Sequence, residues 1–289
     1  MEIGYVSEEN SKCVKQKLRY IFNIVYEKNI DGKTFFILPI TNKTKLNTYV
    51  IRRLSKGLYK KLYKKDIEDV VLSKYLYNVD LLKNKLYGQN VDILDGKKLF
   101  KDLSYNILEY INKYKKEKIE EVSILVNDLS KRNVENIIYI AEKIKRLNII
   151  TNNIDKFKKL EDYLYEENGI NITISNNKQK SLAKAKLIFN YDFPNELINK
   201  FKINANAVII NIPNDIKINS KRFEGVLVND FNITIPVVYK LTGFSDEIMY
   251  ESLIYKKDFE DLINIISKEN ITVKSLIGNN GKINVKELI

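Results

Sequence analysis

The chain has 289 residues, 44% of them hydrophobic, and a formal net charge of +12. This length suffices for one large or two medium domains, and the hydrophobic content is normal for packed cores. No apolar run approaches the ~20 residues that a membrane crossing needs. There is no histidine and one cysteine, Cys13, which excludes histidine-containing triads, the usual zinc ligand sets and an internal disulfide. We interpret Cys13 as a small structural thiol. Because the N-terminus has no apolar signal core, we expect a cytoplasmic protein.

Strands and helices alternate from the start of the chain. EIGYV and TFFILPI predict buried strands, with a helix over 7–29 between them. A helix over about 46–63, the apolar run DVVLSKYL, a helix around NVDLLKNKLYG and the strand VDIL follow. One long helix is predicted over 97–118, with an apolar stripe formed by Leu99, Leu103, Ile107, Leu108 and Ile111. We expect these elements to form a first α/β domain over residues 1–118.

The second half shows a clearer alternation, and we expect a domain over residues 119–289. Segments that are apolar on both faces predict parallel strands at VSILV, LNIIT, INITIS, AKLIFN, NAVIINI and GVLVN. The predicted fold class is therefore α/β with two α/β domains, the second a doubly wound, mostly parallel, Rossmann-like sheet. Residues 244–267 predict one or two further helices, and Gly278-Asn279-Asn280-Gly281 predicts the turn of a closing hairpin.

Three segments of the second half follow one another in an informative order. They are IITNNIDKFKKLEDYL, SLAKAKLIFNYDFP and NANAVIINIPND. Together they resemble the nucleotide-binding domain of the shikimate dehydrogenase and glutamyl-tRNA reductase group, with its strand and Asn-Arg-Thr box, its helix, strand and Asn-Ala-Thr-Pro segment, and its next strand and acidic turn. The resemblance covers roughly residues 120–235. It implies a Rossmann-type domain, NAD(P) as the cofactor and an oxidoreductase activity.

The chain departs from that group where a dinucleotide binds. In place of a GxGxxG turn it has NDLSKRN, residues 127–133, and no glycine occurs between Gly96 and Gly169. Side chains would fill the space where a pyrophosphate meets bare amides, and Asp128 would repel it. Asn153 stands where NADP-dependent relatives place an arginine. We therefore expect no bound cofactor, with NAD(P) as the alternative.

Asn and Asp recur where the predicted strands end. Because the carboxyl ends of parallel strands share one edge of a sheet, these side chains predict a polar rim where open α/β folds bind ligands. The candidate cofactor-binding residues are Asn127, Asp128, Asn152, Asn153, Asn190 and Asp192, and Asn176, Asn177, Asn214, Asp215, Asn229 and Asp230 continue the pattern. The alternatives are helix caps and turns, or carboxylates that bridge a divalent metal.

The most basic segment spans residues 52–65. Its candidate anion-binding residues are Arg52, Arg53, Lys60, Lys61, Lys64 and Lys65. A helix here fits phosphates or an anionic membrane surface, or alternatively an ordinary solvated face. Only six basic residues of the whole chain are arginines, and the enrichment in Lys, Asn, Ile and Tyr is typical of an AT-rich genome.

Three hypotheses for function result. The first is a non-catalytic, Rossmann-like scaffold, partner-binding or regulatory protein that acts with an unidentified protein partner or as a homodimer. The second is an NAD(P)-dependent oxidoreductase with an altered cofactor pose, in which Lys or Tyr supplies the acid or base. The third is a protein that binds nucleic acid or an anionic surface through residues 52–65.

Overall fold

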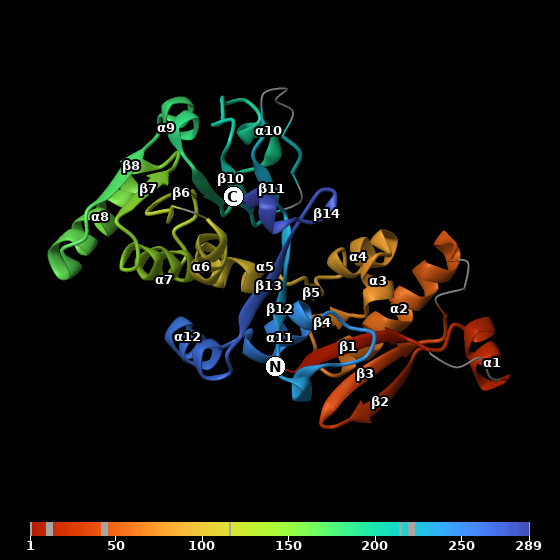
Figure 1. The fold of residues 1–289 in the computed structure, drawn as a ribbon. Coiled ribbons are helices and arrows are strands. Elements are labelled where there is room, and N and C mark those ends of the chain that lie inside the picture. Colours follow the sequence, from red (N-terminus) through yellow and green to blue (C-terminus); the bar gives the residue numbers. More distant parts are fainter. Residues whose placement is uncertain are drawn as a thin grey trace. The chain divides into compact units, whose positions relative to one another are not determined.

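The computed structural model describes residues 2–9, 14–41, 46–115, 117–213, 216–218 and 223–288. Cys13, Asn214 and Asp215 lie outside the described residues. The chain divides into two compact units, drawn in Figure 1. The first unit comprises Met1–Gly96 and Ile235–Lys256, and the second comprises Lys97–Thr234 and Lys257–Ile289. In the part of the chain described, no helix has the length and apolar character needed to span a membrane.

The first unit is built on a five-stranded sheet with the order β2-β3-β1-β4-β5. Its strands are β1 (Ile3–Glu8), β2 (Tyr26–Ile30), β3 (Lys33–Leu38), β4 (Asp69–Leu72) and β5 (Asp92–Leu94). Its helical segments are α1 (Val14–Phe22), α2 (Thr48–Lys64), α3 (Lys74–Tyr77), α4 (Asp80–Tyr87), η1 (Val237–Tyr239) and α11 (Asp246–Ile254). All strand pairs are parallel except β2 with β3.

Both faces of this sheet are covered. On one face, Val6 and Phe36 of the strands join a core with Leu58 of α2 and neighbouring side chains of α4. On the other face, Tyr5 and Phe35 pack with Met249 of α11. Since α11 comes from residues that follow the second sheet in the chain, the first unit needs a distant segment to complete its core.

Residues 23–30 correct the prediction of a single helix over 7–29. Helix α1 ends at Phe22, and Asn23 adopts a left-handed conformation with φ 53°. Strand β2 then pairs with β3 through a turn at Asp31 and Gly32, whose φ angles are 49° and 74°. Asp-Gly with positive φ at both positions is a favoured two-residue hairpin turn. The sequence therefore contained the signal for this hairpin.

The second unit contains a six-stranded sheet in which every pair of neighbours is parallel. Its strands are β6 (Glu121–Leu125), β7 (Arg146–Ile150), β8 (Ile172–Ser175), β9 (Leu187–Asn190), β10 (Val208–Asn211) and β11 (Val226–Val228), in the order β11-β10-β9-β6-β7-β8. This is the doubly wound order of the Rossmann fold, with its switch point between β6 and β9. The predicted fold class is confirmed.

Helices lie on both faces of that sheet, as Figure 1 shows. They are α7 (Lys131–Ala141) and α8 (Ile154–Asn168) on one side, and α9 (Lys178–Lys184) and α10 (Asn195–Ile198) on the other. Leu182 of α9 and Ile198 of α10 join a buried cluster with the strand residue Ile209. Strands that are covered on both sides need apolar residues on both faces, which explains their continuous hydrophobic runs.

The predicted long helix over 97–118 is two helices, α5 (Lys97–Asp102) and α6 (Ser104–Tyr114). The five residues of its predicted apolar stripe are all buried. Helix α6 packs on α7 and on the strand β13 (Thr272–Gly278), so both helices belong to the second unit. This division differs from the boundary near residue 118 that we expected, because α5 and α6 bury their apolar faces against later segments.

The remaining elements of the second unit form a small antiparallel sheet and a helix. They are β12 (Asp230–Thr234), β13, β14 (Gly281–Lys282), α12 (Phe259–Lys268) and η2 (Val285–Leu288). The sheet order is β12-β13-β14, and β13 with β14 forms the predicted hairpin at residues 278–281.

Substitution of two glycines of the first unit by alanine should change the free energy of unfolding in opposite directions. Gly57 lies inside α2, where an added Cβ would make ordinary contacts of 3.5 Å or more. Gly57→Ala should therefore raise the free energy of unfolding by about 0.5–1 kcal/mol, because glycine is costly inside a helix. Gly32→Ala should lower it by about 1–2 kcal/mol, because residue 32 needs positive φ. Urea unfolding of both variants measures this, and equal signs would contradict the assignment.

Candidate functional site

The switch point places two loops side by side at the carboxyl edge of the six-stranded sheet. One is the loop 127–130 between β6 and α7, and the other is the segment 191–193 that follows β9. We call these two segments the switch-point corner. Open α/β folds bind ligands at this position, because neighbouring connections diverge there to opposite faces of the sheet.

The carboxylate of Asp192 occupies the backbone donors of this corner. Its Oδ2 accepts hydrogen bonds from the backbone N–H groups of Asn127 at 2.8 Å and Asp128 at 2.7 Å, while Oδ1 lies 3.0 Å from the Asn127 nitrogen. In a dinucleotide-binding domain, the first strand-to-helix turn presents its amides to pyrophosphate. The first two amides of the corresponding turn here already bind an anion that belongs to the protein.

The corner is a cluster of partly buried charges. Burial raises the pKa of Asp192 above its ordinary value, although the amides of Asp128 and Asn127 oppose that rise. Burial also lowers the pKa of Lys101, against the attraction of Asp102, Asp128 and Asp192. Within the described residues, no group of three or more His, Cys, Asp or Glu side chains could hold a metal ion. The carboxylates of the corner interact with Lys101 and with the backbone amides of Asn127 and Asp128.

A bidentate ion pair joins the start of α7 to α5. Arg132 donates from Nε and Nη2 to the two carboxylate oxygens of Asp102, both at 2.9 Å, and Asn136 donates to Asp102 Oδ1 at 3.2 Å. Asp102 is only 4% exposed. Burial raises the pKa of Asp102 even though Arg132 favours its charged form. The guanidinium nearest the corner is thus bound to an internal carboxylate.

Four of the six predicted rim residues lie together, namely Asn127, Asp128, Asn152 and Asp192. Asp128 and Asn152 contribute backbone N–H groups. Besides Asp192 with Asn127 and Asp128, the Asn127 side-chain oxygen accepts the backbone N–H of Asn152 at 2.8 Å. Asn153 begins α8 without a side-chain cap, and its backbone N–H donates to the Thr151 hydroxyl at 3.1 Å. The side chain of Asn153 is exposed and makes no described contact with the corner.

Asn190 does not face the rim, contrary to the prediction. Its side chain is fully buried and donates to Phe193 O at 2.8 Å and to Asn211 Oδ1 at 2.7 Å. Asn211 donates onward to Asn229 Oδ1 at 3.2 Å, and Asn229 to Asn279 Oδ1 at 2.7 Å. These amides form a chain across the ends of β9, β10 and β11. Buried amides need such partners, which explains part of the strand-end Asn pattern without a ligand.

The predicted anion-binding residues lie on α2 or directly after it. Five of them are exposed and Lys61 is half-buried. Lys65 forms an ion pair with Glu27 at 2.6 Å, and Arg53 donates to the hydroxyl of Tyr49 at 2.8 Å. Anion binding by these residues stays a prediction.

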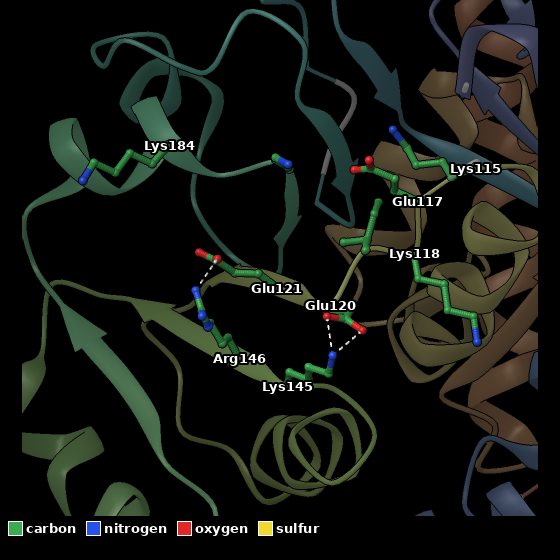
Figure 2. A pocket seen from close by; sticks show the side chains of 10 residues that line it. Lys115, Glu117, Lys118, Glu120, Glu121, Lys145, Arg146 and Lys184 are labelled. Carbon is green, nitrogen blue, oxygen red and sulfur yellow. Dashed lines mark hydrogen bonds and ion pairs between the residues drawn. The ribbon is translucent and has the colours of Figure 1, made fainter.

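A hollow of about 670 Å³ lies at the opposite, amino edge of the same sheet. Figure 2 shows the side chains that line it. Its charged lining consists of Lys115, Glu117, Lys118, Glu120, Glu121, Lys145, Arg146, Lys184 and Lys186. Lys145 pairs with Glu120 at 2.7 Å and Arg146 with Glu121 at 3.8 Å, so two carboxylates neutralise two of the cations. In Figure 2 the Lys118 and Lys184 side chains point away from each other. The lining therefore does not converge on a single point.

Sequence reasoning missed Lys101, Asp102 and Arg132 as neighbours of the corner. Lys101 and Asp102 lie on a helix that we assigned to the first domain, whereas the fold packs it beside α7. Arg132 gave the one available signal, since it follows the glycine-free turn directly. Pairing it with Asp102 requires a contact across 30 residues, which no local pattern records.

Comparison with known proteins gives distant structural similarity. No family model and no curated protein matches the chain. A solved shikimate dehydrogenase in complex with NADP+ is 9% identical, with 93% of this chain and 96% of that chain covered and a TM-score of 0.37. An L-tryptophan dehydrogenase from Nostoc punctiforme is 8% identical, with 94% and 84% covered and a TM-score of 0.33. An N-acetyl-L-ornithine transcarbamylase is 8% identical, with 90% and 89% covered and a TM-score of 0.32. At these values the similarities carry no argument about activity.

Because the pKa of Asp192 is raised, the difference in stability between the wild type and Asp192→Asn should depend on pH. A raised pKa means that the folded protein binds the proton more tightly, so stability from this group is present below the unfolded pKa of about 3.9 and is lost as pH rises through the folded value. The free energy of unfolding of the wild type minus that of Asp192→Asn should therefore fall as the pH rises from about 3.9. Urea unfolding at each pH measures it, with the exposed Asp162→Asn as the control. A difference that rises with pH would contradict the described environment of Asp192.

Loss of Arg132 should be more harmful than loss of the whole ion pair. Arg132→Met leaves the buried Asp102 carboxylate without its guanidinium and should cost about 3–5 kcal/mol of stability. The double variant Arg132→Met with Asp102→Leu removes both charges and should be more stable than Arg132→Met alone. Chemical unfolding of the two variants measures this order, and the reverse order would show that Asp102 does not depend on Arg132.

Proposed function

We propose that the second unit is a Rossmann-type domain whose dinucleotide position is filled by its own side chains. The protein then acts as a non-catalytic scaffold, partner-binding or regulatory protein. The observation that carries this proposal is the Asp192 carboxylate, which takes up the backbone N–H groups of Asn127 and Asp128.

A dinucleotide in the usual pose would have to displace that carboxylate. The pyrophosphate would replace two charge-assisted hydrogen bonds worth about 1.5–3 kcal/mol each. It would also meet the carboxylate of Asp128, while Arg132 is bound to Asp102. A penalty of about 3–6 kcal/mol weakens binding by about two to four powers of ten. Affinity in the usual pose would then be too low for a resident cofactor.

The side chains at the corner offer little acid–base chemistry for hydride transfer. The chain has no histidine. Tyr191 is buried and bonded to the Ser104 hydroxyl at 3.1 Å, and burial raises the pKa of its phenol above the ordinary value. A phenol that holds its proton this strongly is a poor general acid near neutral pH.

One observation favours the oxidoreductase as a second candidate. Lys101 is a partly desolvated amine beside the corner, and burial lowers its pKa. Lysines with a lowered pKa serve as general bases in several enzymes. In this version a nucleotide lies in an altered pose, Lys101 accepts or donates the proton, and Lys101→Met abolishes turnover without loss of fold.

Titration with NAD, NADH, NADP and NADPH separates the two candidates. We expect no saturable change in the thermal stability of the wild type with any of them, whereas a specific ligand at 100 times its Kd adds about 2.7 kcal/mol. Asp192→Ala frees the two amides and removes a negative charge, so its response should equal or exceed that of the wild type, with Asp162→Ala as a matched surface control. A saturable stabilisation of the wild type that Asp162→Ala retains would overturn the proposal.

A further inference from the structure

Helix α1 of the first unit has its apolar side turned to solvent. Leu18, Ile21 and Phe22 are spaced to share one helical face, and Ile21 and Phe22 are each 64% exposed. On the other side, Gln16 is buried and donates to Pro39 O at 2.9 Å. An ordinary surface helix has the reverse orientation. The apolar face of α1 therefore lacks a partner within the described residues of its own unit.

The charged residues of α1 and α2 are all cationic. Neither α1 nor α2 contains an acidic residue. Among the described residues, Arg19 pairs with Glu9 at 3.2 Å and Lys65 with Glu27 at 2.6 Å. The exposed cations of the two helices for which the described part of the chain shows no ion pair are Lys15, Lys17, Arg52, Arg53, Lys56, Lys60 and Lys64.

The turn that follows α1 meets the middle of α2, where a Cβ built on Gly57 lies 3.5 Å from Val25 and 3.7 Å from the carbonyl oxygen of Asn23. Figure 1 shows both helices within the first unit. Tyr49 and Tyr63 of α2 are also exposed, the latter by 75%. We call α1, Ile24 and the exposed side of α2 the α1–α2 surface.

We propose that the α1–α2 surface docks on an anionic phospholipid membrane. The apolar side chains of α1 enter the interface between headgroups and acyl chains, and the cations of both helices face anionic headgroups. A helix that combines an apolar face with flanking lysines is bound in this way by burial of apolar area and by charge together. Tyrosine, with its apolar ring and polar hydroxyl, is a frequent residue at that depth.

Charge complementarity favours this occupant over two others. In a symmetric dimer the same patch faces itself, so the cations of one copy would oppose those of the next. Nucleic acid would pair with the cations but would not bury aliphatic side chains such as Leu18 and Ile21, because phosphate contacts dominate non-specific binding. A membrane that carries acidic lipid satisfies the cationic and the apolar features together. This inference is independent of the function proposed for the second unit.

Vesicle binding of the full chain tests the proposal. Wild type should sediment with vesicles that contain phosphatidylserine in phosphatidylcholine, bind pure phosphatidylcholine about tenfold or more weakly, and lose affinity as salt is added. Ile21→Ser with Phe22→Ser should weaken binding about tenfold or more, since it removes the inserted side chains. Val237→Ser with Val238→Ser is the apolar control, because both valines are exposed on the same unit outside the surface.

Charge is tested by a second matched pair of variants. Lys56→Glu with Lys60→Glu should weaken binding to the acidic vesicles about tenfold or more, whereas Lys156→Glu with Lys159→Glu on α8 makes the same charge change away from the α1–α2 surface and should leave binding within about twofold. Circular dichroism confirms that each variant is folded. The Ser and Glu variants substitute exposed side chains, so loss of fold is not expected to intervene.

Three outcomes would overturn the proposal. The first is equal binding to neutral and acidic vesicles. The second is binding that the Ile21 and Phe22 substitutions leave unchanged, with RNA bound at least as tightly as vesicles, which would assign the cations to nucleic acid. The third is concentration-dependent dimerisation without vesicle binding, abolished by the Phe22 substitution in light scattering, which would assign the face to a second copy.

Discussion

The second unit depends on one hydrogen-bonded anion, the carboxylate of Asp192 against the amides of Asn127 and Asp128. A parallel doubly wound sheet brings strand ends together at its switch point, and the amides of the first loop there point at whatever fills the space. A glycine-rich turn leaves that space to a ligand. Here the carboxylate of Asp192, at the neighbouring strand end, accepts hydrogen bonds from the amides of Asn127 and Asp128 and joins the two halves of the sheet.

Several other polar groups around the corner also have partners within the protein. Arg132 is held by Asp102, and the amide chain from Asn190 to Asn279 links the ends of three strands. Each buried partner offsets the cost that its neighbour would incur if left without a hydrogen bond. These internal hydrogen bonds account for part of the polar residues at the strand ends.

Positive charge distinguishes a surface of this protein only where exposed apolar side chains lie beside the cations. Lysines are spread along the whole sequence, and many of them lie on solvated faces. In the hollow of Figure 2, carboxylates neutralise part of the cationic lining. On α1 and α2 there is no acidic residue, and exposed Ile21 and Phe22 lie among the cations. The combination, rather than the charge alone, distinguishes that surface.

The sequence by itself determined those elements whose burial produces a local periodic pattern of apolar residues. Strands that are covered by helices on both sides must be apolar on both faces, so the six parallel strands and the stripe from Leu99 to Ile111 could be predicted, as could the hairpin at Gly278 to Gly281. The absence of glycine after β6 was likewise visible without a structure. The Asp31-Gly32 hairpin was equally encoded there, although the helical pattern before it obscured the signal.

Tertiary structure decided which polar side chains meet. Asn190 and Asp192 are two residues apart and have the same local character, yet one turns into the core while the other binds the loop that follows β6. The Arg132–Asp102 pair and the return of α11 to the first unit likewise join segments far apart in the chain. Periodicity reports whether a position faces the interior or solvent, but a hydrogen-bond partner depends on strand order and on the direction in which each loop leaves the sheet. Only the folded chain fixes those two quantities.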